Sequence, residues 1–152
     1  MWLDVVHTGF TVSDLDRSVA WYRDVLGLAL ISRQRNENAY SRQIVGMADA
    51  VLEIAFFGLP HESAARRGQV LELVQYRSPV GRVMDLATND VGIGHLALEV
   101  DDLPDEYERL VQLGVHFRSG PVEIDEGHNR GALACYLLDP DGITIELIQR
   151  AD

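Results

Sequence analysis

Several features that restrict what a protein can do are scarce in this chain of 152 residues. It contains one cysteine, Cys135, so an intrachain disulfide and a cluster of thiolate ligands are both excluded. The small and apolar neighbours of Cys135 predict a buried, unreactive thiol. No apolar run approaches the roughly 20 residues that a membrane-spanning helix needs, and the first residues lack the basic and apolar segments of a signal peptide. We therefore expect a cytoplasmic protein that does not enter a membrane.

Basic residues are also few, because 13 Lys and Arg stand against 24 Asp and Glu and the net charge is −11. Such a charge repels the phosphate backbone of a nucleic acid, so we expect no nucleic-acid partner. The same field attracts metal cations, although diffuse acidity usually serves solubility. The hydrophobic content of 47% is ordinary for a globular protein, and the length fits one domain.

The chain contains an internal repeat. One copy begins at His7 in HTGFTVSDL and the other at His95 in GIGHLALEV, residues 92–100. From each histidine a Val, an Asp and a Leu follow at the fifth, seventh and eighth positions. The copies close on matched tetrapeptides, ELVQ from Glu72 and ELIQ from Glu146. The sequence therefore predicts two modules, 1–78 and 91–152, joined by a linker over 79–90 within a single domain of residues 1–152.

The pattern of apolar residues predicts a strand, a helix and three strands in each module. Helical spacing runs over residues 15–26, after the natural N-cap residues Ser13 and Asp14, and over residues 103–113. Gly27 and Gly114 are suited to end these helices. Strands are predicted at 5–12, 28–32, 50–57, 69–76, 93–100, 115–117, 132–138 and 143–148. Loops are predicted at 33–41, 58–68 and 125–131, and one helical turn at 82–86. Two facing four-stranded sheets would enclose a cleft suited to a ligand.

Four polar residues lie at matched places on strands predicted to face inward: His7, Glu72, His95 and Glu146. A His or Glu buried there without a partner costs several kcal/mol. Two imidazoles and two carboxylates can share one divalent metal ion, and nitrogen and oxygen ligands suit Zn, Ni, Co, Mn or Fe(II). Because no thiolate belongs to the set, open positions for water or substrate are expected. The alternative is four unrelated polar groups, which the matched positions disfavour.

On these residues and motifs the chain resembles the vicinal oxygen chelate superfamily, which includes glyoxalases, bleomycin-resistance proteins and extradiol dioxygenases. The resemblance runs from HTGFTVSDLDRSVAWYRDVLGL to DPDGITIELIQ. It implies an α+β fold in which two tandem βαβββ modules form an open, cleft-containing β-barrel around the metal. It also implies that His7, Glu72, His95 and Glu146 bind one metal ion, that the substrate is a small molecule, and that the chain pairs as a homodimer.

The resemblance is closest to glyoxalase I and methylmalonyl-CoA epimerase. In both, the metal holds two substrate oxygens and stabilises an enolate while glutamates transfer a proton. This implies an isomerase, epimerase or glyoxalase-type lyase with Glu146 as a ligand and base. Glu53 is the candidate second base, because the epimerases carry a catalytic glutamate on the strand before the second ligand. A shift of one position would instead place Glu53 on the other face of its strand.

Two departures from these enzymes are visible. Glu72 stands where the epimerases usually carry Gln, and 19 positions containing a long loop separate it from Glu53, unlike in glyoxalase I.

Two other functions stay open. An Fe(II) extradiol-type dioxygenase of a catechol-like substrate would use His7, His95 and Glu146. Those enzymes place a Tyr ten residues before that Glu, where Tyr136 lies, and often a catalytic His eight or nine residues earlier, as at His128. Tyr136 and His128 also have plain interpretations as a strand aromatic and a loop residue. The second alternative is a small-molecule or drug-binding resistance protein, although such members usually lack the metal ligands.

Overall fold

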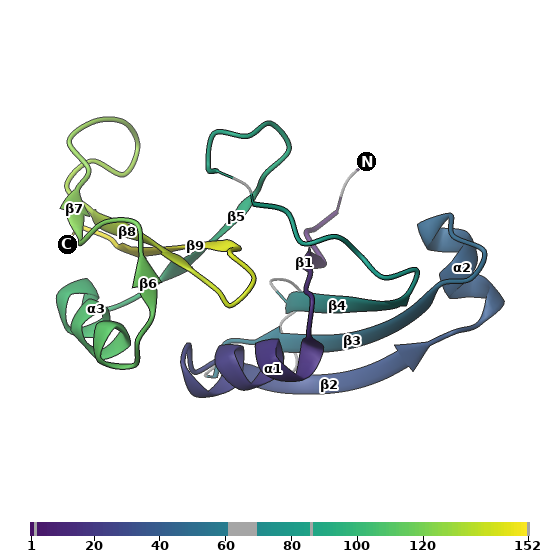
Figure 1. Cartoon of the computed structure of the whole chain (residues 1–152). Helices are drawn as coiled ribbons and strands as arrows, with labels where there is room; N and C mark the ends of the chain where they lie inside the picture. Colours follow the sequence, from purple (N-terminus) through teal and green to yellow (C-terminus); the bar gives the residue numbers. More distant parts are fainter. Residues whose placement is uncertain (2, 61–69, 86, 152) are drawn as a thin grey trace. The chain divides into compact units, whose positions relative to one another are not determined.

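The computed structural model describes residues 1, 3–60, 70–85 and 87–151 (Figure 1). The chain divides into two compact units, Met1–Val83 and Met84–Asp152, and the boundary falls inside the predicted linker 79–90. The helical turn predicted at 82–86 is not present over residues 82–85, and residue 86 lies outside the described residues. The predicted loop 58–68 also falls largely on residues that are not described.

The first unit contains four strands and two helices in its described residues. They are β1 (His7–Thr11), α1 (Leu15–Asp24), β2 (Ala29–Asn36), α2 (Ala39–Val45), β3 (Val51–Gly58) and β4 (Val70–Ser78). The sheet order is β1-β4-β3-β2, in which β1 and β4 are parallel and the other neighbours antiparallel. Because parallel neighbours need a long connection, α1, β2 and β3 all lie between β1 and β4 in the sequence.

Helix α2 corrects the prediction of a loop over residues 33–41. Strand β2 continues to Asn36, and α2 begins at Ala39. The side chain of Asn38 accepts a hydrogen bond from the Ser41 N–H at 2.9 Å and so caps the helix. At the other end Gly46 has φ of 69°, the left-handed conformation that terminates a helix. The polar residues that suggested a loop therefore cap a short helix.

The second unit begins, like the first, with a strand, a helix and further strands, but it has no counterpart of α2 among its described residues. It contains β5 (His95–Glu99), α3 (Leu103–Gln112), β6 (His116–Phe117), β7 (Val122–Glu123), β8 (Leu133–Leu138) and β9 (Thr144–Gln149). The strand order is β5-β9-β8-β6, with β7 also paired to β8, and β5 runs parallel to β9. The predicted α+β class and the two βαβββ modules are confirmed. The strand predicted at 115–117 is observed as β6, which is two residues long, and β7 is a separate short strand further along the chain.

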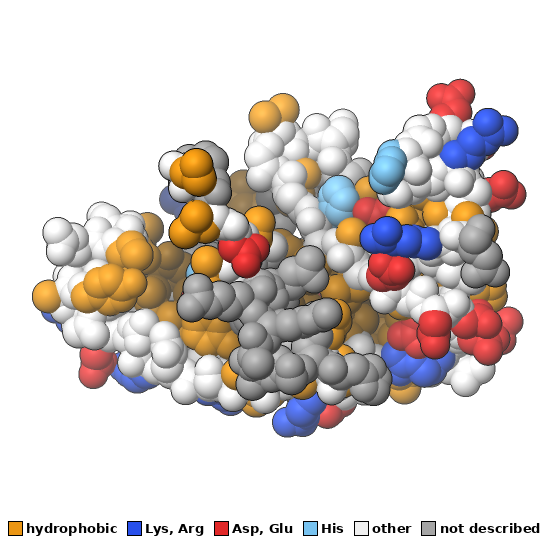
Figure 2. Space-filling model, turned by 180° about the vertical axis from the view of Figure 1, so that it is seen from behind, with side chains coloured by type: hydrophobic (Ala, Val, Ile, Leu, Met, Phe, Trp, Pro, Cys, Tyr) orange, Lys and Arg blue, Asp and Glu red, His pale blue; other side chains and the backbone are white. Residues whose placement is uncertain are grey.

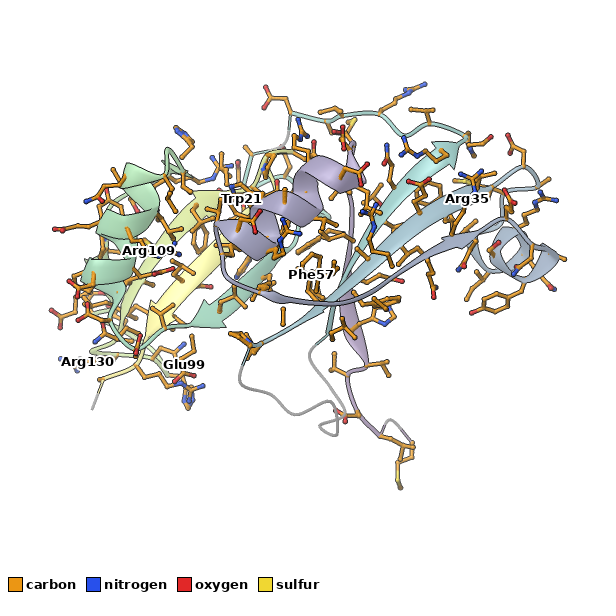
Figure 3. All side chains as sticks on the ribbon, turned by 90° about the horizontal axis from the view of Figure 1, so that it is seen from below. Trp21, Arg35, Phe57, Glu99, Arg109 and Arg130 are labelled. Carbon is orange, nitrogen blue, oxygen red and sulfur yellow. The ribbon has the colours of Figure 1, made fainter. Side chains whose placement is uncertain are left out.

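One face of the first sheet packs against α1. Helix α1 buries Leu15, Val19 and Tyr22 on one side, and the Tyr22 ring lies 6.0 Å from the ring of Phe57 on β3. Figure 3 shows Phe57 between α1 and the strands, with Arg35 at the far end of the sheet. Burying a side chain as large as Phe57 completely stabilises the fold by about 1.5–3 kcal/mol. The helix face therefore holds the main apolar core of this unit.

Helices α1 and α3 are each hydrogen-bonded to the sheet of their own unit by the glutamine that closes the repeated tetrapeptide. The Leu15 N–H, in the first turn of α1, donates to Oε1 of Gln75 at 3.0 Å. The Leu103 N–H, in the first turn of α3, donates to Oε1 of Gln149 at 2.8 Å. The first N–H groups of a helix have no partner within it, so each glutamine satisfies one of them. The repeat in the sequence is thus accompanied by the same hydrogen bond between glutamine and helix in both units.

Charges of both signs are interspersed on the face of the molecule shown in Figure 2, together with exposed hydrophobic side chains. The net negative charge of −11 is therefore not a single acidic patch on this face. None of the described helices is long and apolar enough to cross a membrane.

Candidate metal site

The first candidate pair consists of His7 on β1 and Glu72 on β4. In the parallel register Gly9 lies beside Glu72, so His7, two positions earlier, points to the same face as the glutamate. His7 Nε2 lies 3.3 Å from Glu72 Oε2. Phe56 is the neighbour of Glu72 on β3, and its ring lies 6.3 Å from the His7 ring in an edge-to-face arrangement. The first unit therefore joins two of the predicted ligands beside an aromatic ring.

The second pair, His95 on β5 and Glu146 on β9, repeats this geometry. Ala97 lies beside Glu146 in the parallel register, at the place that corresponds to Gly9. His95 Nε2 lies 3.1 Å from Glu146 Oε2. Tyr136 on β8 faces Glu146, and its ring lies 5.3 Å from the His95 ring at a tilt of 37°. Both pairs thus result from the same register between two parallel strands, which occurs once in each unit.

Within each pair, the distance between the two candidate donor atoms fits two ligands of the same metal ion. With metal–ligand bonds of about 2.1 Å, neighbouring ligands lie about 3.0 Å apart at 90° and about 3.4 Å apart in a tetrahedron. The observed separations of 3.3 and 3.1 Å lie in this range. Both glutamate side chains are only 18% exposed, whereas the histidines are 41% and 47% exposed. The donor set of imidazole and carboxylate suits a divalent first-row metal.

The structure groups the predicted ligands two by two, each pair within one compact unit. Among the residues that the structure describes, no group of three or more His, Cys, Asp or Glu side chains is placed to hold a metal. Two protein ligands leave most coordination positions of a metal open.

Two neighbours distinguish the pairs. A Cβ on Gly9 would lie 3.2 Å from Oε2 of Glu72, so the missing side chain leaves room for the carboxylate, whereas Ala97 fills the corresponding place. Phe56 beside Glu72 corresponds to Tyr136 beside Glu146. Burial raises the pKa of Tyr136, and the Glu146 carboxylate raises it further.

Tyr136 lies beside the second pair, next to Glu146 and His95. The interpretation of Tyr136 as an ordinary strand aromatic did not predict this position. The signal was in the sequence, because a tight DPDG turn joining β8 to β9 makes the residue ten positions before Glu146 its cross-strand neighbour. His128, the other candidate from the dioxygenase resemblance, lies exposed in the turn at residues 128–131.

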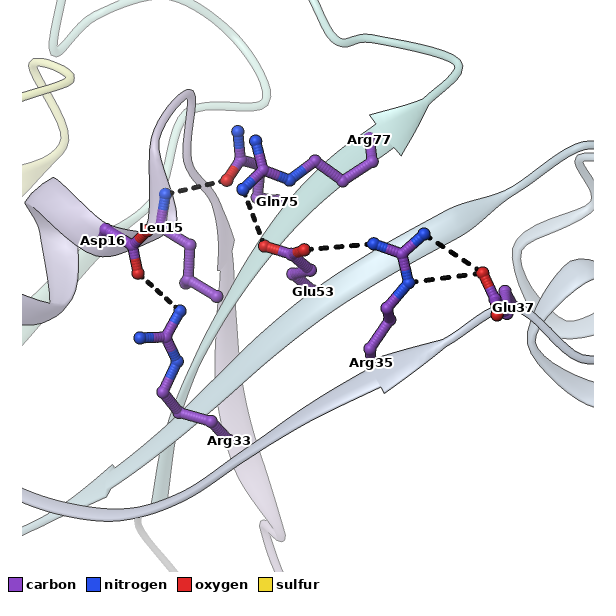
Figure 4. Close-up of polar contacts among 8 residues, drawn as sticks. All are labelled: Leu15, Asp16, Arg33, Arg35, Glu37, Glu53, Gln75 and Arg77. Carbon is purple, nitrogen blue, oxygen red and sulfur yellow. Dashed lines mark hydrogen bonds and ion pairs between the residues drawn. The ribbon is translucent and has the colours of Figure 1, made fainter.

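Glu53 lies on the opposite face of its sheet from Glu72. Its neighbours in the register are Arg35 on β2 and Gln75 on β4, and Gln75 belongs to the face that carries α1. Arg77 donates a hydrogen bond to Glu53 Oε2 at 2.8 Å, and Arg35 donates to Oε1 at 3.3 Å (Figure 4). The Arg77 hydrogen bond is the main cause of a lowered pKa of Glu53. The structure therefore does not bring this residue to the His7–Glu72 pair.

Cys135 on β8 is buried, as its apolar neighbours predict. Burial raises the pKa of its thiol to about 11, with a further contribution from the Glu146 carboxylate. Adjacent residues of a strand point to opposite faces, so Cys135 lies on the face away from Tyr136 and Glu146. The thiol is therefore not part of the candidate site.

Comparison with known proteins identifies the family. The model of the Glyoxalase/Bleomycin resistance protein/Dioxygenase superfamily matches residues 4–147. The chain belongs to this superfamily. It is 33% identical to a lactoylglutathione lyase of Salmonella typhimurium over 97% of this chain and 93% of the relative. It is 31% identical to the lactoylglutathione lyase of Haemophilus influenzae, again over 97% and 93% of the two chains. The resemblance seen in the sequence is thereby confirmed.

Solved structures of other proteins share the fold. A glyoxalase family protein from Bacillus cereus aligns with a TM-score of 0.81 at 21% identity, over 100% of this chain and 97% of that chain. An antibiotic binding protein from Streptomyces aligns with a TM-score of 0.66 at 19% identity, over 99% and 98%. Because enzymes and binding proteins share this fold, the function must be argued from the site.

Proposed function

We propose that this superfamily member is a divalent-metal-dependent lyase of the lactoylglutathione type. The observation that carries the proposal is the repeated His–Glu pair, which has the same register and nearly the same separation in both units. The relatives named lactoylglutathione lyase, at 31–33% identity over almost the whole chain, support the reaction class. The full set of candidate ligands favours an enzyme over a drug-binding protein.

The substrate in this proposal has oxygens on two adjacent carbon atoms. S-lactoylglutathione carries a hydroxyl group on one carbon and a thioester carbonyl on the next. The adduct of methylglyoxal with glutathione is its isomer, with the carbonyl and the hydroxyl exchanged. Moving one proton between the two carbons and one between the two oxygens converts either compound into the other. The reaction is therefore redox-neutral and needs groups that take up and return a proton.

In the proposed reaction, different residues of the chain bind the metal and transfer the proton. His7, Glu72, His95 and Glu146 would hold one metal ion of the type Zn, Ni, Co, Mn or Fe(II). When bound, such an ion acts as a Lewis acid toward the two substrate oxygens. Glu146 is proposed as the base that takes the proton from carbon, and Glu72 is the second carboxylate at a matched place. Glu53 is not included, because its register and its two arginine partners hold it on the other face of the sheet.

We propose, as the family resemblance implies, that the protein is located in the cytoplasm and assembles as a homodimer. The two pairs of one metal site are supplied either by one chain or by two chains, and mixed variants distinguish these arrangements. In a mixed dimer of Glu72→Gln and Glu146→Gln chains, activity returns only if each site takes one pair from each chain. Sedimentation analysis tests the dimer itself.

Elemental analysis and an activity assay test the function. We expect protein purified without chelator to carry a stoichiometric divalent metal and to form S-lactoylglutathione from methylglyoxal and glutathione. Chelation should abolish the activity and added metal should restore it. The variant Glu146→Gln should lose activity, whereas Glu106→Gln on α3 should keep it. Absence of bound metal would contradict the proposal, and so would oxygen consumption by the ferrous protein with a catechol.

A further inference from the structure

The face of the first sheet that carries Glu72 also carries an apolar cluster. Its buried members are Ala50, Leu52 and Ile54. Residues two positions apart on a strand share a face, so the β3 members of the cluster lie on the same face as Phe56, the neighbour of Glu72 in the register. Phe56 packs against the cluster, and its ring lies 6.3 Å from that of His7. The apolar cluster therefore begins beside the His7–Glu72 pair.

Helix α2 packs on the same cluster. Its contact is Val45, which is partly buried there together with Val74 and Tyr76 of β4. The helix connects β2 to β3 at one end of the sheet (Figure 1). It is fixed at both ends, because the Ser41 hydroxyl donates to the Asn38 carbonyl at 2.9 Å and a left-handed glycine follows the last turn. The side chain of Val45 is thus held against the sheet face of Glu72.

The second unit is built differently at the corresponding place. Counted from the matched aromatics on β3 and β8, Ala132 and Ala134 stand where the first unit has Leu52 and Ile54. The described residues between β6 and β8 contain no helix. Large apolar side chains and a helix packed on them are therefore features of the first unit, and the repeat does not require them.

A group attached to a metal-bound ligand meets this cluster after a short distance. A strand rises by about 3.3 Å per residue, so Ile54 lies about 7 Å along β3 from Phe56, the neighbour of Glu72. A phenyl ring on the chelating atoms extends about as far, whereas a methyl group does not. Because packed side chains leave few voids, a place that Val45 already fills is closed to the ring.

We propose that Val45 of α2 limits the size of the substrate group that lies along β3 beyond Glu72. This inference rests on the proposed lyase function and adds a substrate class to it. The adduct of methylglyoxal with glutathione fits, and the adduct of phenylglyoxal, with a ring in place of the methyl group, is disfavoured. Such specificity comes from a clash with the wrong substrate, without an added contact to the right one.

Binding of two hydroxamates to Co²⁺-loaded protein tests the inference without turnover. A hydroxamate binds a divalent metal through oxygens on two adjacent atoms, and acetohydroxamate carries a methyl group where benzohydroxamate carries a phenyl ring. We expect Val45→Ala to lower the ratio of the benzohydroxamate Kd to the acetohydroxamate Kd by about 10-fold. Val45→Leu, which adds bulk, should raise the ratio. Ile44→Ala is the matched control, because Ile44 is 66% exposed on the same helix.

Steady-state kinetics give a second readout. Val45→Ala should raise kcat/KM for the phenylglyoxal adduct by about 10-fold and leave that for the methylglyoxal adduct unchanged. The melting temperature and the metal content of each variant show whether the fold and the site are retained.

Three outcomes would overturn the inference. One is an unchanged ratio of Kd values in folded, Co²⁺-loaded Val45→Ala protein. Another is an equal change of the ratio in Ile44→Ala, because the effect would then not depend on the side chain packed on the sheet. The third is a loss of affinity for both hydroxamates by the same factor, which would assign Val45 to the metal site. A wild-type protein that binds Co²⁺ and both hydroxamates but has no lyase activity would instead refute the proposed function, so the two failures are distinguishable.

Discussion

Glu72 and Gln75 point to opposite faces of the first sheet, although both belong to the tetrapeptide ELVQ on β4. Glu72 lies 3.3 Å from His7 on one face, and Gln75 accepts a hydrogen bond from the Leu15 N–H of α1 on the other. Side chains alternate along a strand, so residues three apart take opposite faces. Glu146 and Gln149 do the same in the second unit. In each unit, one short motif thus supplies a candidate metal ligand on one face of the sheet and a hydrogen bond to the helix on the other face.

The glutamine caps should matter for stability. Gln75 is buried, and its side chain also donates to the Ser13 carbonyl at 2.8 Å. We expect Gln75→Leu to lower the free energy of unfolding by about 1–3 kcal/mol, because it removes the hydrogen-bond acceptor of the buried Leu15 N–H. Urea denaturation measures this loss. Gln112→Leu, at an exposed position of α3, should change stability by less than about 0.5 kcal/mol. Equal effects of the two substitutions would contradict the role of the cap.

Glu53→Gln should leave catalysis intact. The residue lies on the helix-bearing face of the sheet and is held by Arg35 and Arg77, so it does not reach the candidate site. We expect the variant to keep its metal, its kcat and its rate of solvent deuterium exchange into the substrate. A large loss of exchange with normal metal content would restore Glu53 as the second base.

The same substitution should alter the pH dependence of stability. The pKa of Glu53 is lowered in the folded protein, chiefly by the Arg77 hydrogen bond. Its ionised form therefore stabilises the fold above the unfolded pKa, near 4.5, and this contribution is lost as the pH falls through the lower folded pKa. Wild type and Glu53→Gln should differ in denaturation midpoint near neutral pH and converge in acid. Glu99→Gln, which removes an exposed partner of Arg150, should give a smaller difference.

Gly9→Ala should disturb the first pair without unfolding the protein. The new Cβ would lie 3.2 Å from Glu72 Oε2, at the flexible end of that side chain, so the carboxylate must move by a few tenths of an ångström. We expect metal affinity to fall by about 10-fold while the melting temperature is retained. Gly81→Ala, where nothing lies within 4 Å of the added Cβ, is the matched control. Unchanged affinity would mean that the position of Glu72 is not critical.

One shared metal ion and two separate ions predict different stoichiometries. If both pairs hold one ion, Glu72→Gln should weaken the whole site, by about 10²-fold or more in affinity. Glu146→Gln should do the same. Titration with Co²⁺, followed by its absorption spectrum, measures both. Retention of half of the wild-type metal in each variant would show that each His–Glu pair binds its own ion.

Cys135 should be unreactive in the folded protein. With a pKa of about 11, only about one thiol in a thousand is ionised at pH 8, and the group is buried as well. A disulfide reagent should therefore modify it slowly at pH 8 and at the normal rate in urea. Rapid modification of the folded protein would contradict the burial of this strand.

Much of the candidate site could be predicted from the sequence, because the repeat itself carries the information. His7 and His95 were matched by their spacing to the following Val, Asp and Leu, and the glutamates by their tetrapeptides. Each His–Glu pair then forms within its unit, since the first and last strands of a module lie side by side. Local patterns of this kind survive folding because strand parity is a short-range property.

The sequence was less informative about elements and contacts that depend on a neighbouring segment of the chain. The cap at Asn38 converts a predicted loop into α2, although the residues around it are polar. Tyr136 was readable as an ordinary strand aromatic until the register placed it opposite Glu146.

The spacing of residues along the chain was enough to predict two modules, most of their elements and four candidate ligands, because both the duplication and the alternation of strand side chains can be read from spacing. The face of the sheet on which Glu53 lies could be assigned only from the folded protein. The sequence of a strand shows which residues share a face, but it does not show which of the two faces is turned toward a given neighbour. That assignment depends on the groups that pack on each face. Here α1 and the arginines Arg35 and Arg77 occupy the face of Glu53, and His7 occupies the face of Glu72.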